Sequence, residues 1–448
     1  MISRILLFAI LFTIPFVSQA QVSITIEDAI QIALENNYQL KQAENNLSST
    51  DNSVMSAKAD FLPSLSANYN GTRRIGQQFD QTTVSFENVT TNTMGGNLNS
   101  SVTLFNGFSN ILNLRRANTN RDIQIQESQR IRENIIFTTA SRFLQVVLND
   151  ELLRISEENL NISRQQYDRI EALVEVGRSP NVDLLNQAAI VANDEFVVIQ
   201  RENALQNSIT FLMRIMQDDS GMEYQLIMPD ADVLELTPIE LDLREMVETA
   251  LENRRDLRAQ QLLIERNEYD ASLARANLLP TLNASMGISG SYNDRFRDFN
   301  GEPLSYTDQF FDRNVNRFFG FNIQIPIFDN LNRRTTLQNS QINLKNSRLE
   351  LENIRFQINE EVRQAYNDYM SIVKELESSE KALIAAERAY ETELQRYEVG
   401  ASTLIELNQA NANYVESQSN RVQTIYNFVF QEKVLDYYLG RLTESIDF

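Results

Sequence analysis

The side chains that could do chemistry in this sequence are carboxylates, hydroxyls and amides. Its 448 residues include no Cys, His or Trp, which removes disulfides, Cys/His metal sites and the commonest general base. Acidic residues outnumber basic ones by 61 to 40, for a formal charge of −21, whereas nucleic-acid binding needs clustered cations. The remaining candidates for catalytic groups are Asp/Glu pairs on helices, and such pairs more often belong to a solvated helix face than to an active site. The composition argues against an enzyme, a cofactor, a metal site and a nucleic-acid partner.

Two carboxylates stand at equivalent places in two similar stretches, EVGRSPNVDLLNQA and EVGASTLIELNQA. Asp183 follows Gly177 by six residues, and Glu406 follows Gly400 by the same six. Near the start of a helix such an acid interacts with the helix dipole, at ~0.3–1 kcal/mol. Brought into a ring by several chains, acids instead form a cation-selective constriction and can bind multivalent cations. Both interpretations are open at this point.

These stretches belong to a tandem repeat that covers the chain. ALEN occurs at Ala33 and again at Ala250, and LP-x-L occurs at Leu62 and again at Leu279, each pair 217 residues apart. The two Val-Gly pairs are 223 residues apart, so the second copy contains a short insertion. Self-similarity at a fixed spacing indicates two copies of one structural unit.

The repeat sets the expected organisation. We expect a first copy over 21–217, a linker over 218–242 that breaks the helical pattern with Gly and Pro, and a second copy over 243–448. Thr237 and Pro238 are predicted as the cap and first residue of the second copy's opening helix.

Each copy is predicted to contain a very long helix, because residues 108–176 and 329–399 include no Pro or Gly. Apolar residues in the second of these recur every seven positions: Val362, Tyr369, Leu376, Leu383, Tyr390 and Tyr397. A seven-residue period is typical of under-wound helices in left-handed coiled coils. A helix of about 70 residues spans on the order of 100 Å.

The Val-Gly stretches are predicted to be the tips of helical hairpins. Gly177 and Gly400 would each end the long helix as a left-handed residue. Ser179-Pro180 and Ser402-Thr403 follow with the turn and N-cap residue types that start the next helix.

Four segments alternate between apolar and small polar residues: about 62–70, 97–105, 280–289 and 319–327. Their length, ~9–11 residues, is that of a strand spanning a membrane barrel, and their polar face is nearly free of charge. The connections, roughly 71–96 and 291–318, are predicted to be exposed loops. A soluble sheet that caps the bundle is the alternative.

Four strands cannot close a barrel, and lipid forbids open sheet edges. Three chains would supply twelve strands, within the ~8–26 range of outer-membrane barrels, whereas the eight strands of a dimer would be nearly filled by their own side chains. The expected fold class is therefore mainly α, with long coiled-coil hairpins, an internal two-fold repeat and a trimeric 12-stranded transmembrane β-barrel.

Residues 1–20, MISRILLFAILFTIPFVSQA, are predicted to be a cleaved signal peptide. Arg4 precedes an apolar run from Ile5 to Val17, and Ser18-Gln19-Ala20 is a small-x-small cleavage site. A single membrane anchor is the alternative. A cleaved signal places the protein beyond the inner membrane.

Several stretches together resemble the TolC family of outer-membrane efflux and secretion channels: both ALEN openings, both LP-x-L strand starts, the strand exits VTLFNG and IPIFDN, and above all RYEVGASTLIELNQA. The similarity covers almost the whole chain after the signal. The resemblance implies a homotrimer with a barrel in outer-membrane lipid and a helical tunnel through the periplasm. It also implies partners, a periplasmic adaptor protein and an inner-membrane transporter, and no catalytic residues.

The resemblance further implies that Asp183, Tyr397 and Glu406 form the periplasmic gate and selectivity site, with the Tyr397 hydroxyl bonded to Asp183. The adaptor would dock on the turn residues of the tips: Gly177, Arg178, Ser179, Gly400, Ala401 and Ser402.

The chain departs from the family pattern at three gate positions. Ser402 stands where the family has a locking Arg, Val182 where it has that lock's Thr, and Gln409 where it has a second acid. We therefore expect a gate held by fewer polar links. Arg178 could substitute for the missing Arg, although a solvated tip charge is the simpler interpretation.

The expected function is a passive exit duct of a tripartite efflux pump or a type I secretion system, for drugs, metals or proteins. A periplasmic coiled-coil adaptor without a pore is the alternative from another class. An adaptor would be expected to carry one hairpin and no duplicated amphipathic strands.

Overall fold

The computed structural model describes residues 22–80, 84–218, 224–227 and 236–442. The predicted signal peptide, residues 1–20, lies outside the described residues, as does much of the predicted linker.

The chain forms two compact units, and each of them combines segments from both halves of the sequence. The first, here called the tip unit, comprises Met1–Lys41, Arg130–Arg254 and Gln357–Phe448. The second, the sheet unit, comprises Gln42–Gln129 and Arg255–Phe356. Neither copy of the repeat is therefore a compact unit by itself.

The helices repeat in order and in length. In the first half they are α1 (Ile26–Asn36), α2 (Tyr38–Ala59), α3 (Ser109–Glu175) and α4 (Asn181–Met216). In the second half they are α5 (Leu243–Asn253), α6 (Arg255–Ala276), α8 (Asn332–Glu398) and α9 (Leu404–Tyr438). Their lengths are 11, 22, 67 and 36 residues in the first half and 11, 22, 67 and 35 in the second. Matching runs of this kind are what a tandem repeat requires.

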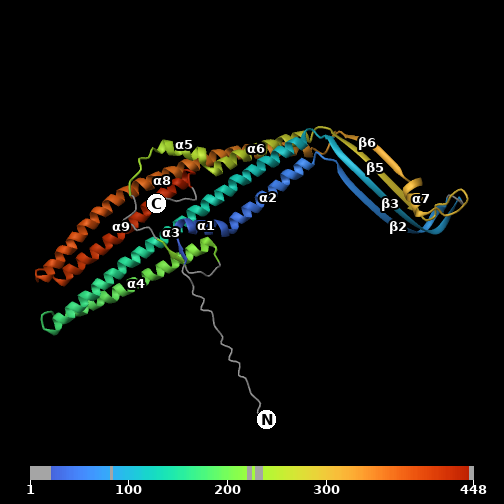
Figure 1. Ribbon diagram of the computed structural model, residues 1–448. Coiled ribbons are helices and arrows are strands. Elements are labelled where there is room, and N and C mark those ends of the chain that lie inside the picture. Colours follow the sequence, from blue (N-terminus) through green and yellow to red (C-terminus); the bar gives the residue numbers. More distant parts are fainter. Residues whose placement is uncertain (1–21, 81–83, 219–223, 228–235, 443–448) are drawn as a thin grey trace, which may run out of the picture. The chain divides into compact units, whose positions relative to one another are not determined.

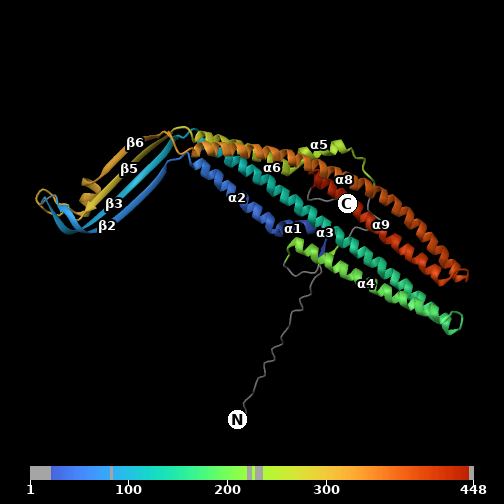
Figure 2. The same cartoon turned by 180° about the vertical axis from the view of Figure 1, so that it is seen from behind.

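The heptad positions of α8 form its packing face in the tip unit. Val362 and Tyr369 are fully buried, and the heptad residues nearer the tip are half-buried. The Tyr369 ring packs on Phe428 of α9, and Tyr390 stacks on Tyr414. Both ribbon views show α8 and α9 side by side, and likewise α3 and α4 (Figures 1 and 2). Among the helices that the structure describes, none has both the length and the apolar character needed to cross a bilayer.

The described residues of the linker contain no helix, as predicted, but the cap of the helix that follows differs from the prediction. A short parallel pair, β1 (Val22–Ile24) with β4 (Tyr224–Leu226), joins the linker to the start of the first copy. The predicted cap at Thr237 was wrong, because α5 starts only at Leu243. The carboxylate of Asp242 accepts a hydrogen bond from the Arg244 amide at 2.7 Å and so provides the cap.

The sheet unit contains one antiparallel sheet of four strands in the order β2-β3-β5-β6. The strands are β2 (Ser64–Asp80), β3 (Ser85–Phe105), β5 (Thr281–Asn293) and β6 (Asn316–Gln324). The two hairpins, one from each half of the chain, join where β3 pairs with β5.

Several strand boundaries differ from the sequence prediction. Residues 71–96 were expected to be mainly a loop, but β2 and β3 remain paired as far as Asp80 and Ser85, since Thr, Val and Ile recur there and favour strands. β6 starts at Asn316 and ends at Gln324 rather than continuing to 327. Pro326 follows, and a proline has no N–H for the ladder.

The second connection contains two short helical turns. They are α7 (Tyr306–Asp308) and a π-helical turn, η1 (Gln309–Arg313). The Gln309 side chain is fully buried and donates to the carbonyls of Asn293 and Leu304. This connection is therefore folded onto the sheet and is not a simple loop.

The register confirms the predicted division of the sheet into an apolar and a polar face. Directly paired residues share a face, and the apolar pairs are Leu282–Ile323, Ala284–Phe321 and Met286–Phe319. The alternate pairs, Asn283–Asn322 and Ser285–Gly320, are small or polar. Ile323 is 64% exposed and Phe321 62%. In the single chain the apolar face is therefore uncovered.

We expect Ile323→Arg to impair assembly of the oligomer and Asn322→Arg to leave it intact, although the two residues are neighbours. Arginine at a lipid-facing position near the bilayer centre costs about 2–4 kcal/mol, whereas the opposite face tolerates it. The measurement is the amount of heat-resistant oligomer in the outer-membrane fraction, which should fall only in Ile323→Arg. Equal loss in both variants, or loss in Asn322→Arg alone, would mean that the apolar face does not contact lipid.

Candidate functional site: the hairpin tips

The first tip ends α3 with a left-handed glycine. Gly177 has φ of +74°, a conformation that costs a residue with a side chain roughly 1–2 kcal/mol. Its N–H donates to the Val174 carbonyl at 2.9 Å, and the Arg178 N–H donates to Leu173 at 2.8 Å. These two bonds are the Schellman pattern, which satisfies carbonyls that the end of a helix leaves free.

The second tip repeats this geometry at the end of α8. Gly400 has φ of +75°. Its N–H donates to Tyr397 at 3.1 Å, and the Ala401 N–H donates to Arg396 at 2.8 Å. A Cβ added at either glycine would meet no atom within 4 Å. Glycine is therefore needed at both tips for its backbone conformation and not for space, as the sequence predicted.

Glu406 is held at the start of α9 by a capping box. The Glu406 N–H donates to Thr403 Oγ1 at 3.3 Å, and the Thr403 N–H donates back to Glu406 Oε2 at 2.8 Å. These hydrogen bonds, first the one from the Thr403 backbone, lower the pKa of Glu406. In the single chain Glu406 is thus a helix N-terminal acid. It is exposed and bears its charge at neutral pH.

Ser402, at the position of the family's locking Arg, takes part in a local cluster that sequence reasoning missed. Its Oγ lies 2.6 Å from a Glu393 oxygen and 3.0 Å from Glu406 Oε2. Arg396 forms an ion pair with the same Glu393 at 2.5 Å and donates to the Ala401 carbonyl. The i,i+3 spacing of Glu393 and Arg396 was the available signal. The second tip is therefore tied together within its own hairpin.

The first tip has a weaker start to its helix. Pro180 is the N-cap of α4 and has no side chain that can cap. Ser179 Oγ donates to the Asp183 carboxylate at 3.2 Å. Arg178 is exposed and forms no ion pair among the described residues, which agrees with a solvated tip charge.

Tyr397 of α8 and Asp183 of α4 lie close together, as the resemblance implied. Burial raises the pKa of Tyr397, and the negative charge of Asp183 raises it further. The implied hydrogen bond from the Tyr397 hydroxyl to Asp183 is absent among the described residues. The Asp183 carboxylate accepts from Ser179 instead. An ion pair between Arg169 and Glu398, at 3.1 Å, joins α3 to α8 beside this pair.

A row of amides connects the two hairpins further from the tips. Gln187 of α4 is 1% exposed and donates to the Ser163 carbonyl of α3 at 3.1 Å. It accepts from Asn408 of α9 at 3.3 Å, and Asn411 donates to Asn159 at 2.9 Å. Sequence reasoning missed this amide row. The motif LNQA, which occurs in both tip stretches and contains Gln187 and Asn408, was the signal.

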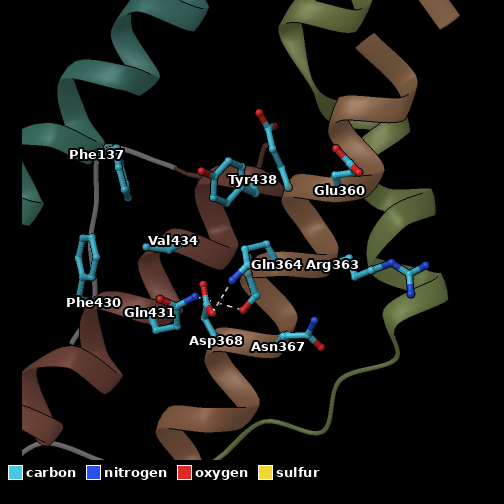
Figure 3. A pocket seen from close by; sticks show the side chains of 12 residues that line it. Phe137, Glu360, Arg363, Gln364, Asn367, Asp368, Phe430, Gln431, Val434 and Tyr438 are labelled. Carbon is cyan, nitrogen blue, oxygen red and sulfur yellow. Dashed lines mark hydrogen bonds between the residues drawn. The ribbon is translucent and has the colours of Figure 1, made fainter. Parts of the chain in front are cut away.

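A groove of about 720 Å³ lies between α8 and α9 of the tip unit, away from the tips. Figure 3 shows Gln364, Asp368 and Gln431 converging in it, with Phe137 and Phe430 at one end. The Gln364 amide donates to Asp368 at 2.8 Å, and Gln431 donates to the Ala365 carbonyl at 3.1 Å. No group of three or more Asp and Glu residues in the described part of the chain could hold a metal ion.

With this geometry in view, the chain can be compared with known proteins. The profile of the outer membrane efflux protein family matches residues 29–216 and 246–441. The chain belongs to this family.

Named relatives agree with this assignment. The chain is 20% identical over 318 residues to the outer membrane protein TolC of Vibrio cholerae, covering 70% of this chain and 69% of that protein. It is 21% identical over 431 residues to the outer membrane efflux protein BepC of Brucella suis, covering 95% and 87%. The solved outer membrane channel CmeC of Campylobacter jejuni superimposes with a TM-score of 0.79 at 16% identity, over 94% of this chain and 87% of CmeC. The fold is that of outer-membrane channels.

The protein is therefore an outer-membrane protein of an efflux-channel family. This location removes the alternative of a periplasmic adaptor.

The capping box gives a test that separates the charge of Glu406 from its hydrogen bonds. Glu406→Gln should retain the box, because glutamine at this position can accept from the cap amide, whereas Glu406→Ala should lose it. Amide hydrogen exchange around Thr403 should therefore be faster in Glu406→Ala than in Glu406→Gln.

The lowered pKa sets the direction of the pH dependence. The bonds favour ionised Glu406 in the folded tip, so its contribution is complete above the ordinary pKa of 4.5 and is lost as pH falls through the lower folded value. Exchange protection at Thr403, corrected for the intrinsic rate, should fall with acid in the wild type and stay constant in Glu406→Gln. Identical profiles in all three proteins would contradict the capping role.

Proposed function

We propose that the protein is the trimeric outer-membrane exit duct of a tripartite efflux pump or a type I secretion system. It passively conducts substrates that an inner-membrane transporter and a periplasmic adaptor deliver. The observation that carries the proposal is the four-stranded sheet, with one exposed apolar face, one small polar face and two edges open to further pairing.

Three copies of this sheet can close into a barrel, whereas the four strands of one chain cannot. β6 of one chain would pair with β2 of the next, which satisfies both edges and gives twelve strands around an open lumen. The apolar face would contact lipid. The polar face, which is rich in Asn, Ser and Gly, would line a wet pore.

The long helices supply the rest of the duct. α3 and α8 each have 67 residues, which corresponds to roughly 100 Å along a helix axis. Helices of that length exceed the needs of a globular core and suit a periplasmic tunnel. Their hairpins would place six tips, two from each chain, at the inner end, where the adaptor docks.

The proposed docking residues are those of the tip turns: Gly177, Arg178, Ser179, Gly400, Ala401 and Ser402. Gly177→Val and Gly400→Val should distort the turns, because a β-branched residue at positive φ is strongly disfavoured. We expect loss of export, measured as increased sensitivity to a panel of toxic compounds, with normal oligomer yield. Gly71→Val is the matched control, since an added Cβ at Gly71 also meets no atom within 4 Å but its φ is ordinary. Normal export in both tip variants would exclude docking at the tips.

The proposed gate is formed by Asp183, Tyr397 and Glu406 of three chains. The single chain already holds Asp183 and Tyr397 close together, and it holds Glu406 ionised and exposed. A ring of such acids would favour cations. Because Val182 and Ser402 lack the groups of the family's lock, the resting channel should conduct more readily than a fully locked relative.

Planar bilayers test the channel and its selectivity together. The wild type should form discrete, cation-selective channels that trivalent cations block. Glu406→Gln should lower the cation-to-anion permeability ratio and relieve the block, since it removes the charge and keeps the capping box. Glu44→Gln, which neutralises an exposed acid of α2, serves as the control. If purified oligomers never conduct, the duct is refuted. If they conduct with the same selectivity in Glu406→Gln, only the acidic ring is refuted.

A further inference from the structure

One arginine interrupts the apolar face of the sheet. Arg317 of β6 pairs with Ile288 of β5, and strand alternation puts it on the same face as Phe319 and Ile323. It is exposed, and no acidic side chain pairs with it among the residues that the structure describes. The edge strand β2 contains only one acid, Asp80, at its far end. A neighbouring copy paired through β2 would therefore bring no carboxylate near the middle of that strand.

Arg317 stands between two hollows on this face. The larger, about 630 Å³, lies towards the helical end of the sheet, and Arg317 is its charged residue. The other residues that line it on this face are Leu65, Leu98, Ser100, Met286, Ile288 and Phe319, and Gly287 and Phe318 of the opposite face also border it. A cation at the end of an apolar groove matches an amphiphile with an anionic head.

The second hollow, about 280 Å³, is bounded by an aromatic shelf from the β5–β6 connection. Phe310 covers the paired glycines Gly96 and Gly290, where an added Cβ would lie 2.6 Å from its ring and 2.3 Å from its carbonyl oxygen, respectively. Its ring contacts Tyr69 and stacks on Tyr306. Tyrosine and phenylalanine clusters of this kind occupy the boundary between lipid and water.

The length of the apolar band agrees with a boundary at Arg317. The strand from Ile323 to Arg317 rises roughly 20 Å at ~3.3 Å per residue. At the ~35–45° tilt of barrel strands this is about 15 Å along the membrane normal, slightly more than half of the ~25 Å apolar band, so Arg317 lies at the edge of the band when Ile323 lies near its centre. Beyond this level β2 continues with Arg73 and Arg74, both exposed. Arginine facing lipid is costly at the bilayer centre and nearly neutral at its edge, where its fork can bind phosphate.

We propose that Arg317, the apolar groove and the Phe310 shelf form a binding site for an anionic, phosphate-bearing membrane lipid. The guanidinium binds the phosphate, and an acyl chain lies along Leu98, Met286 and Phe319. The site rests on the outer-membrane location of the chain and on the proposed barrel, in which this face contacts lipid.

The test uses the full-length protein in detergent with added phosphatidylglycerol, and counts retained lipids by native mass spectrometry. Wild-type protein should retain phosphatidylglycerol, and Arg317→Gln should bind it at least tenfold more weakly. Arg313→Gln, an exposed arginine of η1 outside the groove, should behave as wild type. Phosphatidylcholine, whose phosphate is neutralised by choline, should be retained less.

Equal retention in wild type and Arg317→Gln would overturn the site. Competition by millimolar inorganic phosphate that fully displaces the lipid would overturn the role of the apolar groove. Conductance of the same preparations distinguishes this proposal from the duct. A wild type that retains lipid through Arg317 but never conducts refutes the duct and supports the lipid site. A conducting wild type whose retention does not depend on Arg317 refutes the lipid site alone.

Discussion

Backbone hydrogen bonding at the two edges of one four-stranded sheet constrains the whole molecule. Within the described residues β2 and β6 each have a single neighbour, so one side of each strand presents N–H and C=O groups without a partner in the sheet. In hydrocarbon each such group costs several kcal/mol, and lipid cannot satisfy it. Only another strand can. The apolar face of the same sheet is exposed, so in the proposed barrel lipid would cover this face and further copies of the sheet would satisfy both edges.

In the helical part of the chain, by contrast, the backbone groups at the helix ends find their hydrogen-bond partners within the same hairpin. α3 and α8 end in Schellman turns, and α9 begins with a capping box, so each tip is held together by bonds within its own hairpin. The hairpins are then linked by the amides of Gln187, Asn408, Asn411 and Asn159 and by one ion pair, Arg169–Glu398. In the proposed gate, the contacts between neutral amides would depend less on ionic strength than the Arg169–Glu398 ion pair.

Much of this fold could be predicted from the sequence, because its signals are periodic. Glycine positions located both tips, and alternation located the two faces of the sheet. The predicted ends of elements were wrong where a single residue decides the boundary, as Asp242 does before α5 and Pro326 does after β6. The tip contacts made by Glu393 and Gln187 were missed. The only signal for Glu393 was its i,i+3 spacing to Arg396, and the partners of Gln187 come from other helices, which leave no local pattern. For Glu406 the sequence could not choose between a cap and a ring, because the same carboxylate can do both.

The number of chains in the detergent-solubilised particle tests the central claim most directly, because the proposed twelve-stranded barrel is built from three copies of the four-stranded sheet. Light scattering with the detergent contribution subtracted, or native mass spectrometry, gives this number. The account predicts three chains per particle, with no monomer that remains folded in the membrane. A monomer or a dimer that inserts stably into bilayers would contradict it, since the edges of β2 and β6 would then need another solution.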